Sequence, residues 1–431
     1  MNHFEPRGGE LCVEEVSLSR LAAEVGTPAY VYSTATLERH FSVFRDALSA
    51  RGGLGQPLIA YAVKANSNLS VLGVLARMGA GADTVSEGEI RRALAAAIPP
   101  ERIVFSGVGK TDAEIGFALR VGVMQINIES EPELAEVVRQ ASLAGVRAKI
   151  ALRVNPAIGA GGHAKISTGS VESKFGVSVA EAERLYGAAN ANPSLDVRGL
   201  ACHIGSQIID LAPLAEAFGV MRDLVARIRG AGLRVDRLDL GGGLGVPYFN
   251  QPAPPTPAAF AEMVAANLGG LDVEFIFEPG RVIAANAGVL IARVLHVSVR
   301  PDGRRFLVLD AAMNDLLRPA MYDAYHDVRP VIPRAGSLAP YDIVGPVCET
   351  GDTFARERRL PPLESGDLVA FMSAGAYGAV MSSEYNTRPL VPEVLVRGSE
   401  YAVIRSRPSY ADMLAREPLA PWLRSLNPPP R

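Results

Sequence analysis

The chain has 431 residues, of which 48% are apolar and 21% charged, and its 43 basic and 46 acidic side chains give a formal net charge of −3. This apolar fraction excludes a disordered chain, and the near-neutral balance argues against a dedicated nucleic-acid binder. Three distant cysteines without a C-x-x-C pair favour a reducing, cytoplasmic setting and no structural zinc site. We expect neither a signal peptide nor a membrane segment, because the first residues are polar and no apolar run approaches roughly 20 residues.

The middle of the chain has a regular β-then-α pattern. A helix is expected over 34–48, and from about residue 55 to 282 short β-rich runs alternate with stretches whose apolar residues recur every three or four positions. Such alternation implies parallel strands joined by helices, and eight units in about 230 residues fit an α/β fold of the (β/α)8 barrel type better than an open doubly wound sheet. The expected strands are 58–63, 81–85, 102–106, 124–129, 148–154, 197–203, 235–240 and 273–278.

Beyond residue 282 the apolar runs are separated by turns containing Gly or Pro, which predicts a mostly antiparallel β domain. The β-rich runs LCVEEV and PAYVYS near the N-terminus fit the same domain. We therefore expect a barrel over 34–282 and a β domain formed by 1–33 and 283–431. The strands expected after the barrel are 289–299, 305–310, 367–372 and 390–396, followed by a tail with the only tryptophan, Trp422.

Lysine is rare in this chain, with five residues among the 43 basic ones. Lys64 ends the first barrel strand, in YAVKAN, and reactive groups in such barrels lie at the carboxyl ends of strands. An amine at this place suits a Schiff base with an aldehyde. If it is partly desolvated and near other cations, its pKa is expected to be lowered so that it reacts as the free amine.

The loops after strands seven and eight predict an anion site. LGGGLG follows strand seven and FEPGR ends strand eight with Arg281, and phosphate sites in this fold are commonly built by these two loops. Glu278, beside that site, suits the ring nitrogen of pyridoxal phosphate, which a carboxylate keeps protonated. In CHIGSQ, after strand six, His203 suits stacking on an aromatic ring and Ser206 suits a hydrogen bond to the phosphate.

Two nucleotide-binding motifs are incomplete. The glycine run departs from the dinucleotide fingerprint at Val246, and GVGKT lacks the glycine that a phosphate-binding loop needs at position 104, where the chain has Val104. The sequence therefore predicts no nucleotide site, and it offers no metal site.

Nine motifs follow one another along the chain, and these are YAVKAN, HAKISTG, SKFG, CHIGSQ, GGGLG, EPGR, MNDLLRPAMYDAYH, CET and GAYG. By these motifs and their order the chain resembles, over essentially its whole length, the diaminopimelate decarboxylases. That family belongs with ornithine and arginine decarboxylases to the fold-type-III pyridoxal-phosphate enzymes.

This resemblance implies that pyridoxal 5'-phosphate is the cofactor and that Lys64 holds it covalently. Glu278 would pair with the ring nitrogen, supported by Arg153, while His203 lies against the ring. Asp83 and Glu87 match acidic positions near the lysine. The residues implied around the phosphate and the rest of the cofactor are Ser206, Gly242, Gly243, Arg281 and Tyr377.

The resemblance also implies the substrate. Arg318 and Tyr322 match residues that bind the distal carboxylate of a diamino diacid, which ornithine and arginine lack. Cys348 resembles the proton donor to the product carbanion, and Glu349 the residue that binds the distal ammonium. The full substrate-binding set implied is Arg281, Arg318, Tyr322, Glu349 and Tyr377.

In this family the CET segment reaches the active site of the neighbouring subunit, so a homodimer would be obligatory for activity. The reaction implied is decarboxylation of meso-2,6-diaminopimelate to L-lysine and CO2, the last step of lysine biosynthesis. Three alternatives stay open at this point, namely a decarboxylase for a D-ornithine or D-lysine type substrate, a non-catalytic cofactor carrier and a racemase. A Gly-rich segment, 157–172, is the candidate for a lid over the substrate.

Overall fold

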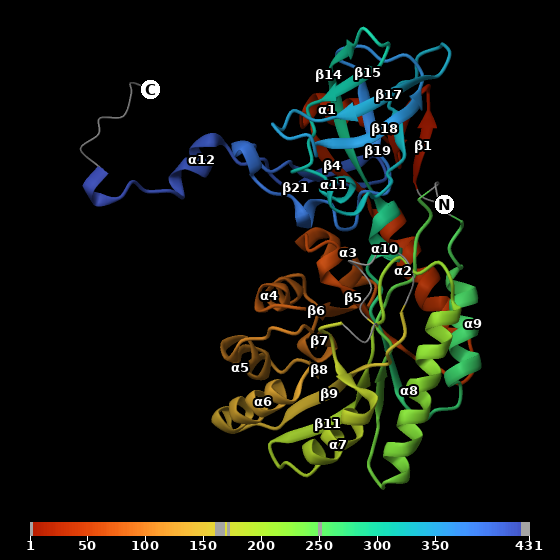
Figure 1. The fold of residues 1–431 in the computed structure, drawn as a ribbon, viewed down its shortest axis with the longest axis vertical. Coiled ribbons are helices and arrows are strands. Elements are labelled where there is room, and N and C mark those ends of the chain that lie inside the picture. The colour runs from red at the N-terminus through yellow and green to blue at the C-terminus, as the bar shows by residue number, and fades with distance from the viewer. Residues whose placement is uncertain (1–2, 160–168, 170–172, 249–251, 424–431) are drawn as a thin grey trace.

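The computed structural model describes residues 3–159, 169, 173–248 and 252–423. It contains a barrel of eight parallel strands and a second domain of mixed but largely antiparallel strands, which Figure 1 shows at opposite ends of the molecule. All eight predicted barrel strands are present, each within two residues of its expected ends. They are β5 (Leu58–Ala62), β6 (Gly81–Thr84), β7 (Ile103–Phe105), β8 (Gln125–Ile128), β9 (Ala148–Asn155), β11 (Leu195–Ala201), β12 (Arg237–Asp239) and β13 (Glu274–Phe277).

The sheet closes because β5 pairs in parallel with both β6 and β13. The two-residue strand β10 (Val177–Ser178) adds to β9 outside this ring. All five residues of β5 are buried, as expected for a strand covered by side chains on one face and helices on the other. The (β/α)8 prediction is confirmed.

Helices alternate with the strands and cover the outside of the barrel. Several begin where a polar side chain accepts a hydrogen bond from the first turn, as Ser86, Thr111 and Ser130 do, and two end at glycines in the left-handed region, Gly122 and Gly145. The helices are α2 (Thr34–Ser49), α3 (Leu69–Arg77), α4 (Glu87–Ala95), α5 (Asp112–Val121), α6 (Glu131–Ala144), α7 (Val179–Asn190), α8 (Ala212–Gly230) and α9 (Pro257–Leu268).

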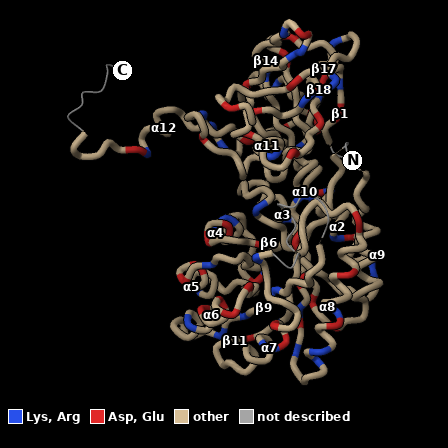
Figure 2. Tube along the Cα trace, in the orientation of Figure 1, with Lys and Arg blue, Asp and Glu red and all other residues tan. Residues whose placement is uncertain are grey.

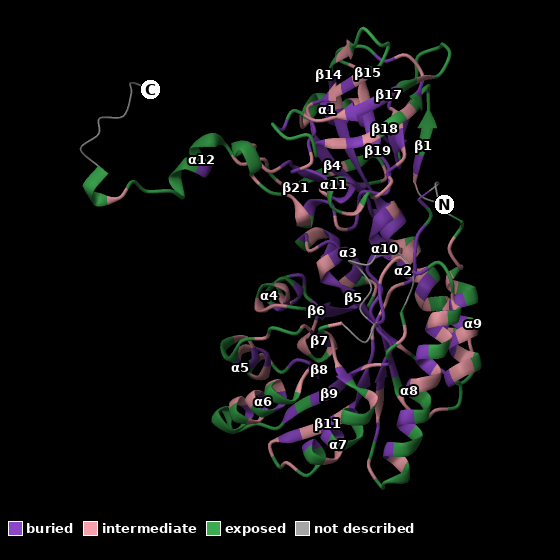
Figure 3. Ribbon diagram, in the orientation of Figure 1, coloured by how far each residue is buried: buried purple, intermediate pink, exposed green. Residues whose placement is uncertain are grey.

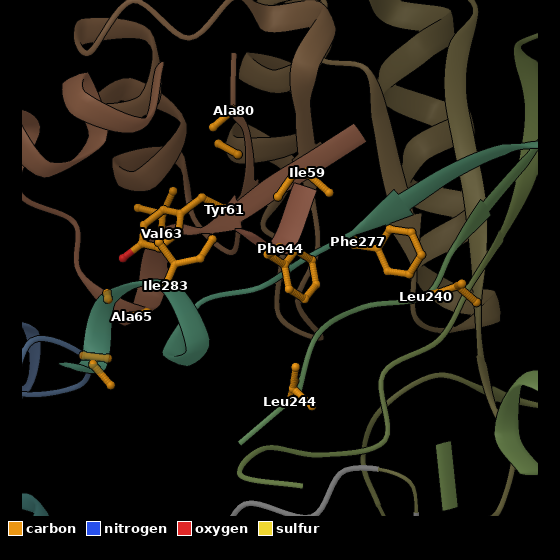
Figure 4. Packing of buried hydrophobic residues seen from close by; sticks show 14 of the residues in the cluster. Phe44, Ile59, Tyr61, Val63, Ala65, Ala80, Leu240, Leu244, Phe277 and Ile283 are labelled. Carbon is orange, nitrogen blue, oxygen red and sulfur yellow. The ribbon is translucent and has the colours of Figure 1, made fainter. Parts of the chain in front are cut away.

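The packing around β13 fixes the strand that leads to Glu278. The Phe44 ring of α2 meets the Phe277 ring edge-on, with centroids 6.4 Å apart, and stacks on Phe260 of α9 at 5.8 Å. Figure 4 shows Phe44 and Phe277 among apolar side chains that continue to Leu240 and Ile283. This continuous core holds the ends of β5, β12 and β13 in fixed relative positions.

The second domain is built from both chain ends. Strand β4 (Ala29–Ser33) lies between β14 (Gly288–Val299), with which it pairs antiparallel, and β20 (Glu393–Arg397), with which it pairs in parallel. The remaining strands of this sheet are β15 (Arg305–Leu309), β16 (Val328–Pro330), β17 (Ala339–Val344), β18 (Thr353–Leu360), β19 (Leu368–Phe371) and β21 (Glu400–Arg405).

The first residues form a small sheet of their own, β1 (Phe4–Arg7), β2 (Glu10–Val13) and β3 (Val16–Ser17), followed by α1 (Leu18–Glu24). It is joined to the second domain by a hydrogen bond from the Leu11 amide to the Val331 carbonyl at 2.7 Å. The division at residues 34 and 282 stays a prediction.

Two features concern the rest of the chain. The candidate lid 157–172 falls mostly outside the described residues. Among the residues that are described, no helix is both long and apolar enough to cross a membrane. After β21 the chain extends away from the second domain and forms α12 (Tyr410–Ala415) and η7 (Pro421–Leu423), on the left of Figure 1.

Candidate active site

The carboxyl ends of the barrel strands surround two cavities that share Lys64, His203 and Glu278. The larger cavity, about 340 Å³, is also lined by Arg153 and Asp239. The smaller one is lined by the predicted phosphate residues and by one residue of the second domain, and these are Ser206, Gly242, Gly243, Arg281 and Tyr377. The structure thus brings together most of the residues that the sequence singled out.

Lys64 lies in the short turn η1 (Val63–Ala65) that ends β5, and its Nζ donates to Asp83 Oδ2 at 2.6 Å. The Asp83 side chain is fully buried, whereas that of Lys64 is 37% exposed. Burial acts to lower the pKa of Lys64, but Asp83 and then Glu278 outweigh it, so this pKa is raised above its ordinary value. The expectation of a lowered pKa was wrong, because carboxylates rather than cations surround the amine.

The other acidic position predicted near the lysine behaves differently. Glu87 begins α4 and pairs at 2.6 Å with Arg91 on the same helix. Glu89 is the acidic residue of that helix on which Asp83 and Lys64 act. Burial raises the pKa of Glu89 to about 7, and its carboxylate accepts the Val85 amide at 2.8 Å. Helical spacing explains the difference, since two residues along a helix point in different directions.

Glu278 and Asp239 form a buried pair of carboxyl groups joined by a hydrogen bond, which requires a shared proton. Asp239 also accepts from Asn127 Nδ2 and from the Gly241 amide, both at 3.0 Å. Burial raises the pKa of Asp239 to about 6, and burial with the neighbouring Asp239 charge raises the pKa of Glu278 well above its usual range. Oε1 of Glu278 is buried with no hydrogen-bond partner in the described structure.

Arg153 lies against the larger cavity, but its ion pair is with Glu129, at 2.8 Å, and not with Glu278. Glu129 also accepts the Gly107 and Gly176 amides, each at 3.0 Å. Arg153 lies 4.8 Å from the centre of the Phe175 ring, which lines the same cavity. In this structure Arg153 and Glu129 thus join β9 to the loops after β7, β8 and β9, and the support of Glu278 by Arg153 stays a prediction.

The lysine of the rejected nucleotide motif has a structural position. Lys110 Nζ is fully buried and donates to the carbonyls of Gly107 and Asn127, both at 2.7 Å, and to Glu133 Oε1 at 2.5 Å. Burial lowers the pKa of Lys110. This lysine links the loop after β7 to β8 and to α6.

Arg281 is buried in the smaller cavity. Its Nη2 donates to Ser206 Oγ at 3.2 Å and its Nη1 to Tyr248 Oη at 2.9 Å, while its guanidinium lies 4.7 Å from the centre of the Tyr377 ring. Tyr377 comes from the second domain and reaches the barrel through a hydrogen bond from its amide to the Ala65 carbonyl at 2.8 Å. Arg281 and Ser206 thus form a preassembled anion site next to Lys64.

The glycine run is required by the packing of the loops themselves. A Cβ on Gly242 would overlap the Glu278 carbonyl, and one on Gly243, whose φ is +113°, would overlap the Gly205 carbonyl. The Gly242 amide donates to His203 Nδ1 at 3.2 Å. Burial lowers the pKa of His203 well below its usual value, and Lys64 and Arg153 add to this, so the ring is neutral.

A second buried arginine, Arg318, is connected to this anion site through the Tyr248 side chain. Arg318, at the start of α11 (Arg318–Tyr322), interacts with the Tyr248 hydroxyl and with His326 Nε2, the latter at 2.9 Å. Burial acts to raise the pKa of Tyr248, but Arg281 and Arg318 together lower it below its ordinary value. Tyr322 is close enough to Arg281 for their charges to interact.

Sequence reasoning missed Asp239, Tyr248 and His326. His326 could have been predicted, because it is the last residue of the motif MNDLLRPAMYDAYH, which also contains Arg318. Asp239 precedes the glycine run at a strand end, which is the position that marked Lys64. Tyr248 follows an irregular loop, and no periodicity marks it.

Cys348 and Glu349 lie elsewhere. Both are exposed on the second domain, beside η6 (Tyr385–Thr387), and neither lines the two cavities. The Cys348 amide donates to Asn386 Oδ1 at 3.1 Å, and Glu349 accepts a hydrogen bond from Tyr385. The structure of one chain does not bring this segment to Lys64.

The residues present fit pyridoxal phosphate. They offer an amine for the aldehyde, a buried carboxyl oxygen without a partner for the ring nitrogen, a neutral imidazole beside both cavities, and the Arg281–Ser206 site for the phosphate. Within the described residues, no group of three or more His, Cys, Asp or Glu side chains is arranged to hold a metal ion.

Comparison with known proteins gives one consistent result. Residues 34–285 match the family model described as "Pyridoxal-dependent decarboxylase, pyridoxal binding domain". The chain is 48% identical to the diaminopimelate decarboxylase of Zymomonas mobilis, over 97% of this chain and 99% of the relative, and 50% identical to that of Pseudomonas fluorescens, over 98% and 100%.

Solved structures agree with the sequence comparisons. The diaminopimelate decarboxylase of M. jannaschii superposes with a TM-score of 0.92 at 33% identity, covering 98% of this chain and 100% of that one, in a complex with L-lysine. The Helicobacter pylori enzyme, also with L-lysine, gives a TM-score of 0.88 at 41% identity over 93% and 98%.

Proposed function

The chain belongs to the diaminopimelate decarboxylases within the pyridoxal-dependent decarboxylases, and on that basis we propose that it converts meso-2,6-diaminopimelate to L-lysine and CO2. This reaction is the last step of lysine biosynthesis, and we assign the enzyme that carries it out to the cytoplasm. Pyridoxal phosphate, when bound, supplies an electron-poor ring that accepts the electron pair left when the Cα–carboxylate bond breaks.

The chain's own residues have separate tasks at the cofactor. Lys64 would hold the aldehyde carbon, Arg281 and Ser206 the phosphate, and Glu278 the ring nitrogen. Glu278 suits this task because its pKa is raised, so it retains a proton that it can share with a ring nitrogen. His203, neutral and fixed by the Gly242 amide, would lie against the ring.

The observation that carries the substrate assignment is the second buried arginine. Arg318 and Arg281 both hydrogen-bond to the Tyr248 hydroxyl. An arginine here would attract a second carboxylate and repel the terminal ammonium of ornithine or lysine. This feature favours a diamino diacid over the D-ornithine or D-lysine type of substrate.

We assign the proton donor to a second copy of the chain. The product carbanion needs a proton at Cα, and the partner subunit's Cys348 would supply it while the partner subunit's Glu349 binds the distal ammonium. The exposure of both residues, and their absence from the two cavities of their own chain, support a homodimer with shared active sites.

The substrate assignment is tested by measuring CO2 release from a panel of amino acids with the cofactor added. We expect turnover of meso-diaminopimelate and none of D-lysine, L-ornithine or L-arginine. Comparable turnover of ornithine would contradict the assignment. Racemisation of any panel member without CO2 release would support the racemase alternative, and binding of cofactor without turnover the carrier alternative.

A further inference from the structure

Two buried arginines near the barrel mouth are held by hydroxyl and imidazole groups. Arg281 and Arg318 are 7% and 6% exposed, and in the described part of the chain neither forms an ion pair with an Asp or Glu side chain. Carboxylates are not scarce, since Figure 2 shows acidic and basic residues interspersed over both domains. Elsewhere a buried arginine pairs with one, as Arg153 does with Glu129 at 2.8 Å. Because an unpaired buried charge is costly, two of them together are typical of a site that anionic ligands complete.

The two arginines come from different parts of the fold. Arg281 begins α10 (Arg281–Ala284), which Figure 3 shows between the two domains and coloured mostly as buried. Arg318 begins α11, at the end of the second domain that faces the barrel in Figure 1. The Tyr248 hydroxyl accepts from Arg281 Nη1 at 2.9 Å and is also hydrogen-bonded to Arg318. The barrel thus contacts Arg318 through Tyr248.

His326 contacts the same guanidinium from within the second domain. Its Nε2 lies 2.9 Å from Arg318 Nη1, and its Nδ1 lies 2.9 Å from the Met372 carbonyl oxygen. An arginine can only donate and a carbonyl can only accept, so Nδ1 carries the proton and Nε2 accepts from Arg318. Burial, together with the Arg318 charge, lowers the pKa of His326 to about 3. The imidazole is therefore neutral and has one tautomer.

The backbone around His326 holds this ring in place. The Met372 amide donates to the Asp327 carbonyl at 2.8 Å, and β16 and β19, which these residues adjoin, pair antiparallel. Arg358 of β18 donates to the His326 carbonyl at 2.9 Å. The His326 side chain is buried and meets the Tyr248 ring edge-on, with centroids 5.8 Å apart. The acceptor atom Nε2 is thus fixed by the sheet and not by a mobile loop.

A neutral acceptor has a specific consequence for Arg318. A guanidinium has five N–H groups in a rigid fork, so the contacts with Tyr248 and His326 orient it and leave donors for a ligand. The Tyr248 ring also lies 5.0 Å from the guanidinium carbon. A carboxylate in place of the imidazole would orient the fork as well, but its ion pair with Arg318 would compete with an incoming carboxylate.

We propose that His326 is a positioning residue for the substrate: its neutral ring orients the Arg318 guanidinium and leaves the charge of that arginine for the distal carboxylate of meso-diaminopimelate. The inference rests on the proposed function, since it takes that carboxylate as the ligand of Arg318. It adds a residue of the second domain that selects the substrate without touching it.

The first test compares two side chains of equal size at position 326. In His326→Gln an amide oxygen replaces Nε2 as the acceptor, whereas His326→Glu places a carboxylate there. We expect KM for meso-diaminopimelate to rise less than about fivefold in the Gln variant and at least about 10 times more in the Glu variant, with kcat within about threefold of the parent in both. His296→Leu, at an exposed histidine of β14, is the control and should leave both constants unchanged.

A second comparison separates the orientation of Arg318 from packing. His326→Leu fills a similar volume without an acceptor and should raise KM about 5- to 30-fold, and the smaller rise in His326→Gln then measures rescue by the acceptor. Affinity for 1,5-diaminopentane, which has no carboxylate, should change less than about threefold in all three variants. Equal losses for this diamine and for meso-diaminopimelate would show that the ring only fills space, and would overturn the inference. Thermal unfolding followed by circular dichroism checks that each variant folds, and the Leu and Gln variants repeat the comparison without a buried charge.

Binding is measured apart from turnover, so that the inference and the proposed function can fail separately. The change in cofactor absorbance when the holoenzyme binds meso-diaminopimelate gives a dissociation constant for each variant. Equal constants in the Gln, Glu and Leu variants would overturn the role of His326, whatever their turnover. A parent enzyme that binds meso-diaminopimelate but releases no CO2 would overturn the proposed function, and the difference in affinity among the variants would still decide on His326.

Discussion

The barrel mouth and the exposed CET segment of the second domain each carry part of one predicted site. A single chain brings the residues of the mouth together, but it leaves Cys348 and Glu349 away from them. At the mouth, Lys64 donates to the buried Asp83 at 2.6 Å, and Glu278 is hydrogen-bonded to the buried Asp239. Arg281 donates to Tyr248 at 2.9 Å and to Ser206 at 3.2 Å. In the CET segment, Cys348 and Glu349 are exposed, and their hydrogen bonds to η6 hold them on the second domain. A site gathered at parallel strand ends is fixed by the fold of one chain, whereas an exposed loop acquires its function only from what covers it.

The largest effect should come from the mouth. Lys64→Ala removes the only described amine in the two cavities, and we expect CO2 release to fall roughly 10³-fold or more. The visible absorbance of the lysine-bound cofactor should vanish as well. Lys149→Ala, at an exposed position of β9, is the matched control and should keep parental activity. Substantial turnover by Lys64→Ala would show that the mouth does not hold the chemistry.

Mixing two inactive variants tests whether the two regions meet across subunits. Cys348→Ala alone should lose about 10²-fold in turnover, as expected for removal of a proton donor. When it is mixed in equal amounts with Lys64→Ala and the subunits exchange, half of the dimers contain one intact site, so activity should recover to about a quarter of the parental value. No recovery, with exchange demonstrated by mass spectrometry, would mean that Cys348 acts within its own chain or not at all.

How far the sequence determines each region follows from the same difference. Lys64, His203, Glu278 and Arg281 were predictable because alternating β and α periods place strand ends, and strand ends of a barrel meet. The Glu129 partner of Arg153 was not, since side-chain pairing among loops leaves no periodic signal. The raised pKa of Lys64 was also missed, because it depends on how many carboxylates converge and not on where the lysine stands in the chain.

A third prediction concerns the second arginine at the mouth. Arg318→Ala should raise KM for meso-diaminopimelate about 10- to 100-fold, the range expected for loss of a hydrogen-bonded charged contact, with a smaller effect on kcat. Arg356→Ala, an exposed arginine of β18, is the control. Steady-state kinetics on both variants decide the matter, and an unchanged KM would remove the observation on which the substrate assignment rests.

The carboxyl pair should have a measurable effect on stability. The pKa of Asp239 is about 6 in the folded chain and near 3.9 when unfolded, so the folded state binds the extra proton and its stabilising effect is lost as the pH rises from about 4 through 6. Asp239→Asn should remove this loss, on the order of 1–3 kcal/mol between pH 4 and 7. Urea unfolding of the cofactor-free protein at several pH values measures it, and a pH profile identical to that of the parent would show that the pair shares no proton.

The smallest effect on cofactor affinity is expected at the anion site, because several neighbouring groups there would bind the same phosphate. Ser206 Oγ accepts from Arg281 Nη2 at 3.2 Å, so Ser206→Ala removes one hydroxyl while leaving the guanidinium, which Tyr248 also holds at 2.9 Å. A single neutral hydrogen bond contributes about 0.5–1.5 kcal/mol, which corresponds to a roughly 3- to 10-fold weaker affinity for pyridoxal phosphate. Fluorescence titration of the cofactor-free protein measures this affinity. A loss above 100-fold would mean that Ser206 orients Arg281 rather than adding one contact, and the mouth would then depend on fewer groups than its packing indicates.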